Sequence, residues 1–87
     1  MNPPRQPSCG AIVVTWDPLR RRPKAFVWRR RRYRIERVVQ RWVIETGWWN
    51  DGIRVSRQYS RVSAEGRVFD IYFDRQSKQW FLERALN

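Results

Sequence analysis

Histidine is absent from the sequence, and Cys9 is the single cysteine among 87 residues. A disulfide needs two cysteines and a structural zinc ion needs a set of cysteine or histidine ligands, so neither can form within this chain. Cys9 also has no histidine to activate its thiol as a nucleophile. We therefore expect a domain with no metal ion and no cofactor, stabilised by packing alone.

Acidic residues are scarce as well, with eight Asp and Glu against nineteen Lys and Arg. Asp70 and Asp74 are four residues apart, which on a strand corresponds to roughly 13 Å at about 3.3 Å per residue. That separation is too long for a general acid and base or for a shared magnesium ion, and we expect these side chains to form surface ion pairs with arginine. The four glycines form no phosphate-binding loop motif. The sequence therefore predicts a protein that is not an enzyme.

Long hydrophobic runs are missing too. No run approaches the roughly 20 residues of a transmembrane helix, and the N-terminal residues contain no signal-peptide core, so we expect a cytosolic (cytoplasmic) protein without membrane contact.

All five prolines lie within the first 23 residues. We predict a flexible tail over residues 1–10 and one small domain over residues 11–87.

Arginine and aromatic residues are abundant. The formal net charge is +11, and Lys24 and Lys78 are the only lysines. So high a positive charge creates an electrostatic field that attracts polyanions, and planar guanidinium groups suit bidentate contacts with phosphate. A GC-rich genome would explain the preference for Arg over Lys, but not the net charge. Six Trp, four Phe and three Tyr supply a core, since each large ring buries on the order of 150–250 Å².

Short runs of β-branched and aromatic residues, separated by turn residues, predict strands. These runs cover residues 11–16, 25–30, 33–45, 53–63, 68–73 and 80–86. We expect the first run to be an edge strand and residues 19–23 to form a basic loop tip. So many short strands at close spacing predict an all-β fold, an antiparallel meander of five to six strands curled into an SH3-like or OB-like barrel.

Residues 33–45 are ambiguous, because their hydrophobic positions also fit an amphipathic helix. The β-forming side chains and the lack of an N-terminal capping residue favour a strand. Its alternation changes phase part-way, which predicts a bulge near Val38 and Val39. In the later runs, alternation places Tyr59 opposite the polar Ser60, and Leu82 opposite Ala85.

Four segments resemble a bacterial family of unknown function: AFVWRRRRYRIERV, RWVIETGWW, EGRVFDIYFDR and QWFLERAL. The resemblance covers residues 12–87. Similar segments occur in small stand-alone proteins and at the C-terminal end of ImuB-like relatives of Y-family DNA polymerases. The chain departs from the family pattern in the turn after Trp28, where Arg30 or Arg31 stands in place of a glycine, and in having no polymerase-like region. The resemblance implies a DNA repair and translesion synthesis context, without an activity.

The basic run in the middle of the chain is the candidate nucleic-acid-binding surface, joined by arginines of the next strand and by the Trp48–Trp49 pair. Its residues are Arg29, Arg30, Arg31, Arg32, Arg34, Arg37, Arg41, Arg54, Arg57, Arg61, Trp48 and Trp49. Arginine would neutralise phosphates, and one indole would stack on a base. The alternatives are a merely solvated strand face and packing of both indoles at the core or rim. We expect Trp16, Trp28, Trp42 and Trp80 to be structural.

Two functions remain open. One is a basic module that binds nucleic acid, DNA rather than RNA, through phosphates more than bases. The other is an adaptor that docks a repair or replication protein, using the edge of residues 11–16 for strand addition. Single or double strand, sequence preference and oligomeric state are undetermined by the sequence.

Overall fold

A computed structural model describes residues 10–46 and 55–86, and this part of the chain contains strands and turns but no helix. The strands are β1 (Gly10–Asp17), β2 (Arg22–Trp28), β3 (Arg31–Thr46), β4 (Val55–Ala64), β5 (Arg67–Asp74) and β6 (Gln79–Ala85). The expected tail, apart from Gly10, and three candidate residues (Trp48, Trp49 and Arg54) lie outside the described residues. The all-β prediction is confirmed.

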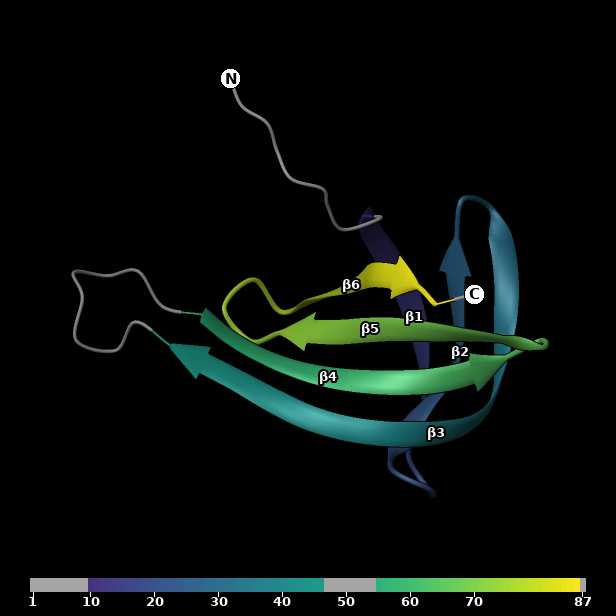
Figure 1. The fold of residues 1–87 in the computed structure, drawn as a ribbon, viewed down its shortest axis with the longest axis horizontal. Coiled ribbons are helices and arrows are strands. Elements are labelled where there is room, and N and C mark those ends of the chain that lie inside the picture. Colours follow the sequence, from purple (N-terminus) through teal and green to yellow (C-terminus); the bar gives the residue numbers. More distant parts are fainter. Residues whose placement is uncertain (1–9, 47–54, 87) are drawn as a thin grey trace.

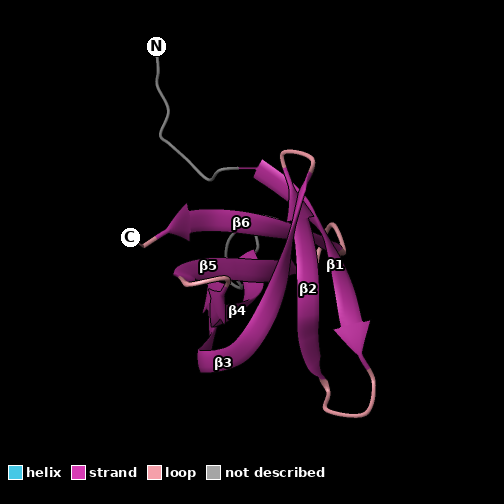
Figure 2. Cartoon of the chain, turned by 90° about the vertical axis from the view of Figure 1, so that its right-hand side faces the viewer, coloured by secondary structure: helices cyan, strands magenta, loops and turns pink. Residues whose placement is uncertain are grey.

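The six strands form a closed antiparallel barrel in chain order, with β6 returning to β1 (Figure 1). β1 and β2 cross β4, β5 and β6 at a steep angle, and β3 curves from one group into the other (Figure 2). The expectation of an edge strand is wrong for the start of β1, because Gly10 to Ile12 pair with β6 while Val13 to Asp17 pair with β2. Closure removes most of the free sheet edge that a small meander would otherwise expose.

β3 is the longest strand and confirms the strand prediction for residues 33–45 over the helical alternative. Its pairing with β4 shifts register twice, between Ile35 and Arg37 and between Val38 and Gln40. The second shift is the predicted bulge near Val38–Val39. Extra residues on one strand bend it and increase its twist, and these two shifts lie where β3 curves between the two groups of strands.

Two-residue turns connect β2 to β3 and β4 to β5. Glu65 and Gly66 in the second turn have φ angles of 51° and 80°, as a type I′ hairpin requires. Arg29 and Arg30 occupy the same positions in the first turn, with φ angles of 54° and 66°. The turn after Trp28 therefore holds two arginines in a left-handed conformation that glycine or asparagine usually adopts, and Arg29 and Arg30 are turn residues and not strand residues.

Aromatic and aliphatic side chains from all six strands fill the barrel. The core cluster consists of Ile12, Phe26, Tyr33, Ile35, Val62, Ala64, Phe69, Ile71 and Leu82. Phe26 stacks on Tyr33 with ring centroids 5.0 Å apart, and Phe69 meets both rings edge-on. Aromatic residues therefore do supply much of the core, as their abundance in the sequence predicts.

The predicted faces of β4 and β6 need correction. Ser60, Val62 and Ala64 are buried and point into the barrel, so Tyr59 is on the outer face although it is buried too. A register shift between Asp70 and Ile71 lets β6 gain one residue, which brings Ala85 against the core beside Leu82. Simple alternation failed in β6 because a bulge changes the phase of every residue after it.

Candidate nucleic-acid interface

A basic cleft of about 270 Å³ lies on the outer face of β1, β2 and β3. It forms because Tyr33 and Ile35 point into the core, which directs Arg32 and Arg34 outward. Arg32 pairs with Val27 and Arg34 with Ala25, so both guanidinium groups border β2. The cleft is lined by Asp17, Arg20, Arg22, Lys24, Arg32, Arg34 and Ile35. Below we call this set the cationic cleft.

Asp17 is the single acidic residue lining the cationic cleft, and its carboxylate is already engaged. Its Oδ1 accepts hydrogen bonds from the backbone N–H groups of Leu19 (3.0 Å) and Arg20 (3.2 Å), and Oδ2 lies 3.7 Å from the Arg20 guanidinium. The backbone hydrogen bond from Arg20 is the largest cause that lowers the pKa of Asp17 below its usual value. Asp17 is therefore ionised at neutral pH and offsets one of the five positive charges.

The other four cations of the cleft form no ion pair with a carboxylate in the part of the chain that the structure describes. Among the described residues, the ion pairs within 4.0 Å involve none of Arg22, Lys24, Arg32 and Arg34. Arg22 Nε is buried and, within that part of the chain, has no hydrogen-bond acceptor. A buried donor without an acceptor costs free energy, so an anion bound in the cleft would supply what the protein lacks there.

Arg29 and Arg31, at the β2–β3 turn and the start of β3, each lie against an aromatic ring. The guanidinium of Arg29 is 4.6 Å from the Trp28 ring centroid, and that of Arg31 is 5.1 Å from the Tyr33 ring. Arg31 also forms an exposed ion pair with Glu65 at 3.5 Å. Arg30 projects from the turn and is exposed.

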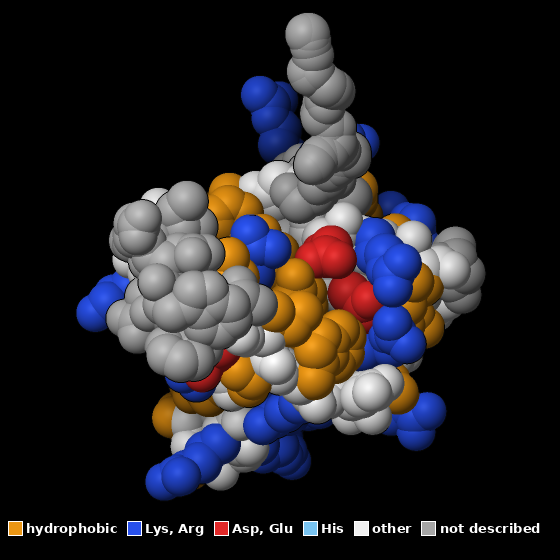
Figure 3. Space-filling model, turned by 60° about the vertical axis from the view of Figure 1, so that its left-hand side comes forward, with side chains coloured by type: hydrophobic (Ala, Val, Ile, Leu, Met, Phe, Trp, Pro, Cys, Tyr) orange, Lys and Arg blue, Asp and Glu red, His pale blue; other side chains and the backbone are white. Residues whose placement is uncertain are grey.

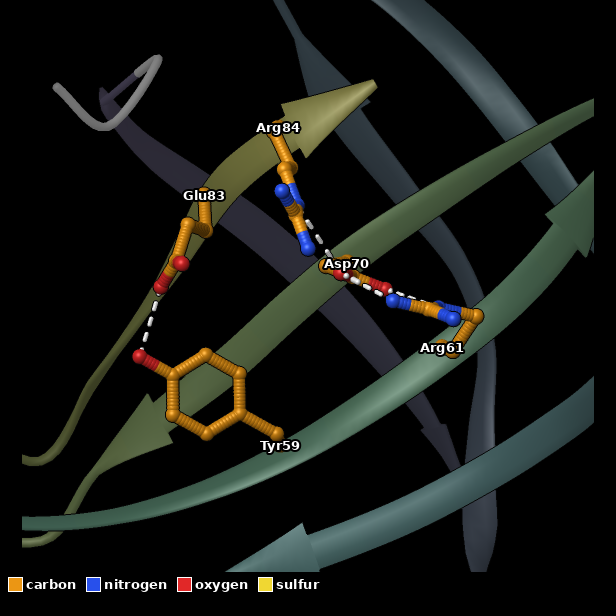
Figure 4. A network of polar contacts seen from close by, with 5 residues as sticks. All are labelled: Tyr59, Arg61, Asp70, Glu83 and Arg84. Carbon is orange, nitrogen blue, oxygen red and sulfur yellow. Dashed lines mark hydrogen bonds and ion pairs between the residues drawn. The ribbon is translucent and has the colours of Figure 1, made fainter. Parts of the chain in front are cut away.

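Arg57 and Arg61 lie on the outer face of β4, where both take part in contacts within the barrel wall. Arg61 forms a two-point hydrogen bond with Asp70, and Asp70 also accepts from Arg84 (Figure 4). Arg57 lies 4.6 Å from the Tyr72 ring and donates to the Tyr59 hydroxyl at 3.4 Å. The expected surface ion pair of Asp70 is instead buried.

Rings on this outer face form a row across four strands. Trp42 stacks on Tyr59 with centroids 5.0 Å apart, and Tyr59 is followed by Tyr72 at 4.9 Å and Phe81 at 5.3 Å. Direct cross-strand pairing explains the row, because paired residues share one face of a sheet. The row is a second packed layer outside the barrel, which the sequence analysis did not anticipate.

Arg37 and Arg41 occupy separate places on β3. Arg37 is exposed beside the first register shift. Arg41 pairs with the inward-pointing Ser60, and its Nη2 donates to the carbonyl oxygen of Arg21 at 3.3 Å. Arg41 therefore contacts the β1–β2 loop and does not join Arg37.

Comparison with known proteins was informative at the level of family. A family model described as a domain of unknown function, DUF6504, matches residues 13–87. The chain belongs to this family. No curated protein and no solved structure matched the chain significantly.

In this DUF6504 domain the predicted arginines do not form one continuous surface. Lys and Arg side chains project from several places around the face shown in Figure 3 and border a central hydrophobic area. Of the candidates, Arg32 and Arg34 converge in the cationic cleft. They are joined by Arg20 and Arg22 from the predicted loop tip and by Lys24, none of which was a candidate. The antiparallel hairpin that pairs residues 25–28 with 31–34 is the signal that would have found them, because it places residues 22–24 just beyond Arg34.

Neither a metal site nor a membrane-spanning helix is found in the described part of the domain. Within residues 10–46 and 55–86, no group of three His, Cys, Asp or Glu side chains is placed to hold a metal ion. The same residues include no helix of the length and apolarity needed to cross a membrane.

Proposed function

We propose that this domain is a non-enzymatic module that binds DNA by holding backbone phosphates in the cationic cleft. The observation that supports the proposal is the convergence of Arg22, Lys24, Arg32 and Arg34 around one cleft, where no carboxylate of residues 10–46 and 55–86 forms an ion pair with them. Guanidinium groups suit phosphate oxygens because they donate in a planar fork.

If phosphate contacts carry the binding, the affinity for DNA should depend on salt concentration in a predictable way. Four cations that each neutralise one phosphate predict that log affinity falls against log salt with a slope of roughly −3 to −4. Such contacts carry little sequence information, so binding should be similar across sequences.

The resemblance to the C-terminal region of ImuB-like polymerase relatives supports DNA over RNA, and a cytoplasmic role in DNA repair and translesion synthesis. This context is part of the proposal, because the family carries no assigned activity. It agrees with the chemistry of the cleft, which suits a polyanion.

The two lysines provide a matched test. Lys24 lines the cationic cleft, whereas Lys78 lies in the β5–β6 turn outside it. The affinity of each variant for a labelled oligonucleotide would be measured by fluorescence anisotropy over a salt series. Lys24→Glu should weaken binding about tenfold or more at low salt and make the salt slope less steep by at least one phosphate contact. Lys78→Glu, with the same change in net charge, should have a small effect. Equal losses in both variants would show that only net charge matters and would sink the proposed site.

One observation favours the adaptor as a second candidate. Pairing of β1 with β6 ends at Ile12 and Trp80, and beyond it a gap of about 410 Å³ opens beside Val13 and Val14. The β1 backbone there has no β6 neighbour, so a strand of a repair or replication protein could be added. Absence of oligonucleotide binding even at low salt would leave this candidate ahead.

A further inference from the structure

A second concavity lies at one end of the barrel, beside the β1–β2 loop. Its volume is about 280 Å³, which is small for a drug-sized ligand and suited to a single ring system. Its lining is Trp16, Pro23, Arg41, Gln58, Ser60, Phe73 and Trp80. No residue of this set is acidic.

Aromatic faces form the walls of this pocket. Trp16 and Trp80 have ring centroids 6.3 Å apart and a 36° angle between their planes, and Phe73 lies 5.3 Å from Trp80. Trp16 keeps 48% of its surface exposed although its ring packs against Trp80. A partly exposed indole in a concave site is what a flat ligand needs for stacking.

Polar groups complete the pocket on its β3 and β4 side. Arg41 offers guanidinium donors, Gln58 offers an amide with both a donor and an acceptor, and Ser60 offers a hydroxyl. The hydrogen bond from Arg41 to the Arg21 carbonyl oxygen anchors this guanidinium at the β1–β2 loop. Together these groups match the edge of a heterocycle that both donates and accepts.

The pocket and the cationic cleft lie on opposite sides of the same two strands. Trp16 and Pro23 line the pocket, while their chain neighbours Asp17, Arg22 and Lys24 line the cleft. The β1–β2 loop that separates the two sites carries the exposed Arg20, which lines the cleft, and the exposed Arg21. A strand bound in the cleft can therefore cross this loop without leaving positively charged surface.

We infer that the pocket accepts one unpaired nucleobase of the strand whose phosphates occupy the cationic cleft. This inference rests on the proposed function and adds a preference for single strands, because a base in a duplex is paired and stacked and is not free to enter. Stacking on an indole face tolerates any base, and the chemistry is shared by DNA and RNA. A cationic ligand is disfavoured, since Arg41 lines the pocket and no carboxylate does.

The test uses the whole chain with Trp16→Leu, and Leu19→Ala as the matched control. Leu19 lies in the β1–β2 loop, three residues after Trp16 on β1; it is 93% exposed and does not line the pocket. Probes are an oligothymidylate, an oligouridylate, an abasic strand of equal length and a duplex. Trp16→Leu should weaken oligothymidylate binding roughly tenfold, as loss of one stacked base does, with the salt slope unchanged. Duplex and abasic affinities, and all affinities of Leu19→Ala, should stay the same.

Different failures have different meanings. If wild type binds the abasic strand as tightly as oligothymidylate, or if Trp16→Leu binds oligothymidylate like wild type, the base pocket is wrong while phosphate binding stands. If no probe binds at low salt, the proposed function fails as well. Photo-cross-linking of wild type to a bromodeoxyuridine strand gives a readout that needs no variant, and we expect adducts at Trp16 or Trp80. Adducts confined to other residues would show that the pocket takes another group, such as a partner's side chain. Comparison of oligothymidylate with oligouridylate shows whether DNA or RNA supplies the base.

Discussion

The carboxylate of Asp70 accepts two hydrogen bonds from the guanidinium of Arg61, at 2.8 and 3.0 Å. Asp70 on β5 is only 1% exposed, and Arg61 on β4 is its direct cross-strand partner. Arg84 on β6 adds a third hydrogen bond at 3.3 Å (Figure 4). The carboxylate of Asp70 therefore links three strands. Arg61 is held in the barrel wall by this contact and is not free to bind a phosphate.

Asp70→Asn should reduce the free energy of unfolding by about 2–3 kcal/mol, because charged hydrogen bonds are lost at a buried position. Urea denaturation of both proteins measures the difference. Glu36→Gln is a suitable control, since Glu36 is exposed and its carboxylate accepts a single 3.3 Å hydrogen bond from Ser63. A loss for Asp70→Asn no larger than that of the control would contradict the structural role of the pair.

Replacement of the β2–β3 turn by Arg29→Asn with Arg30→Gly should stabilise the fold by about 1–2 kcal/mol. The reason is that both arginines have positive φ angles, which cost L-residues energy and suit Asn-Gly. Thermal or chemical denaturation gives the change. A double alanine variant at the same positions removes the same charges but keeps the strained backbone, so it should gain no stability. If both variants gain equally, charge repulsion and not backbone conformation is relieved.

Alkaline pH should destabilise the protein through Tyr59 and Tyr72. Burial raises the pKa of both hydroxyls, and Tyr59 also donates a 2.6 Å hydrogen bond to Glu83. The folded state holds these protons more tightly than the unfolded state, so their contribution is complete below the ordinary tyrosine pKa of about 10 and falls as pH rises above it. Denaturation at a series of pH values measures this fall.

A variant isolates the contribution of Tyr59 to this pH dependence. Tyr59→Phe should lose about 1 kcal/mol at neutral pH with the hydrogen bond to Glu83, and its stability should then depend less on alkaline pH. An equally steep alkaline loss in this variant would assign the effect to other groups.

Chemical modification should distinguish the two lysines when DNA is bound. Lys24 lines the cationic cleft and should be protected from an amine-reactive label, while Lys78 in the β5–β6 turn should react as in the free protein. Mass spectrometry of peptides with and without oligonucleotide gives the ratio. Protection of Lys78 alone would place the bound strand on the other side of the barrel.

The fold was accessible from the sequence because its strands carry strong local signals. Alternating Phe69, Ile71 and Phe73 and the Glu65-Gly66 turn specify a hairpin without further information. Closure was expected only as an economical arrangement, and the role of β1 as the strand that closes the barrel depends on pairing between residues far apart in the chain. The face of Ala85 was missed because a bulge leaves no clear mark in composition.

The candidate site was predicted only in part. Arginine content indicates attraction to polyanions, but side-chain partners decide which arginines are free. Arg61 looked like Arg32 in the sequence, yet Asp70 lies opposite the first and no carboxylate pairs with the second among the described residues. Arg22 was assigned to the loop tip of residues 19–23 and Lys24 to no element, whereas both belong to β2, in which Pro23 between them is buried.

The join between β1 and β6 is short, with three residue pairs, whereas ten pairs connect β3 and β4. Because this pairing is the shortest, the barrel should open there first, and Gly10 to Ile12 should exchange their amide hydrogens soonest among the paired segments. If these pairs separated, the barrel would become a curved open sheet with two unpaired edges. Unpaired edges can pair with another chain, so resistance to aggregation depends on the stability of those three residue pairs.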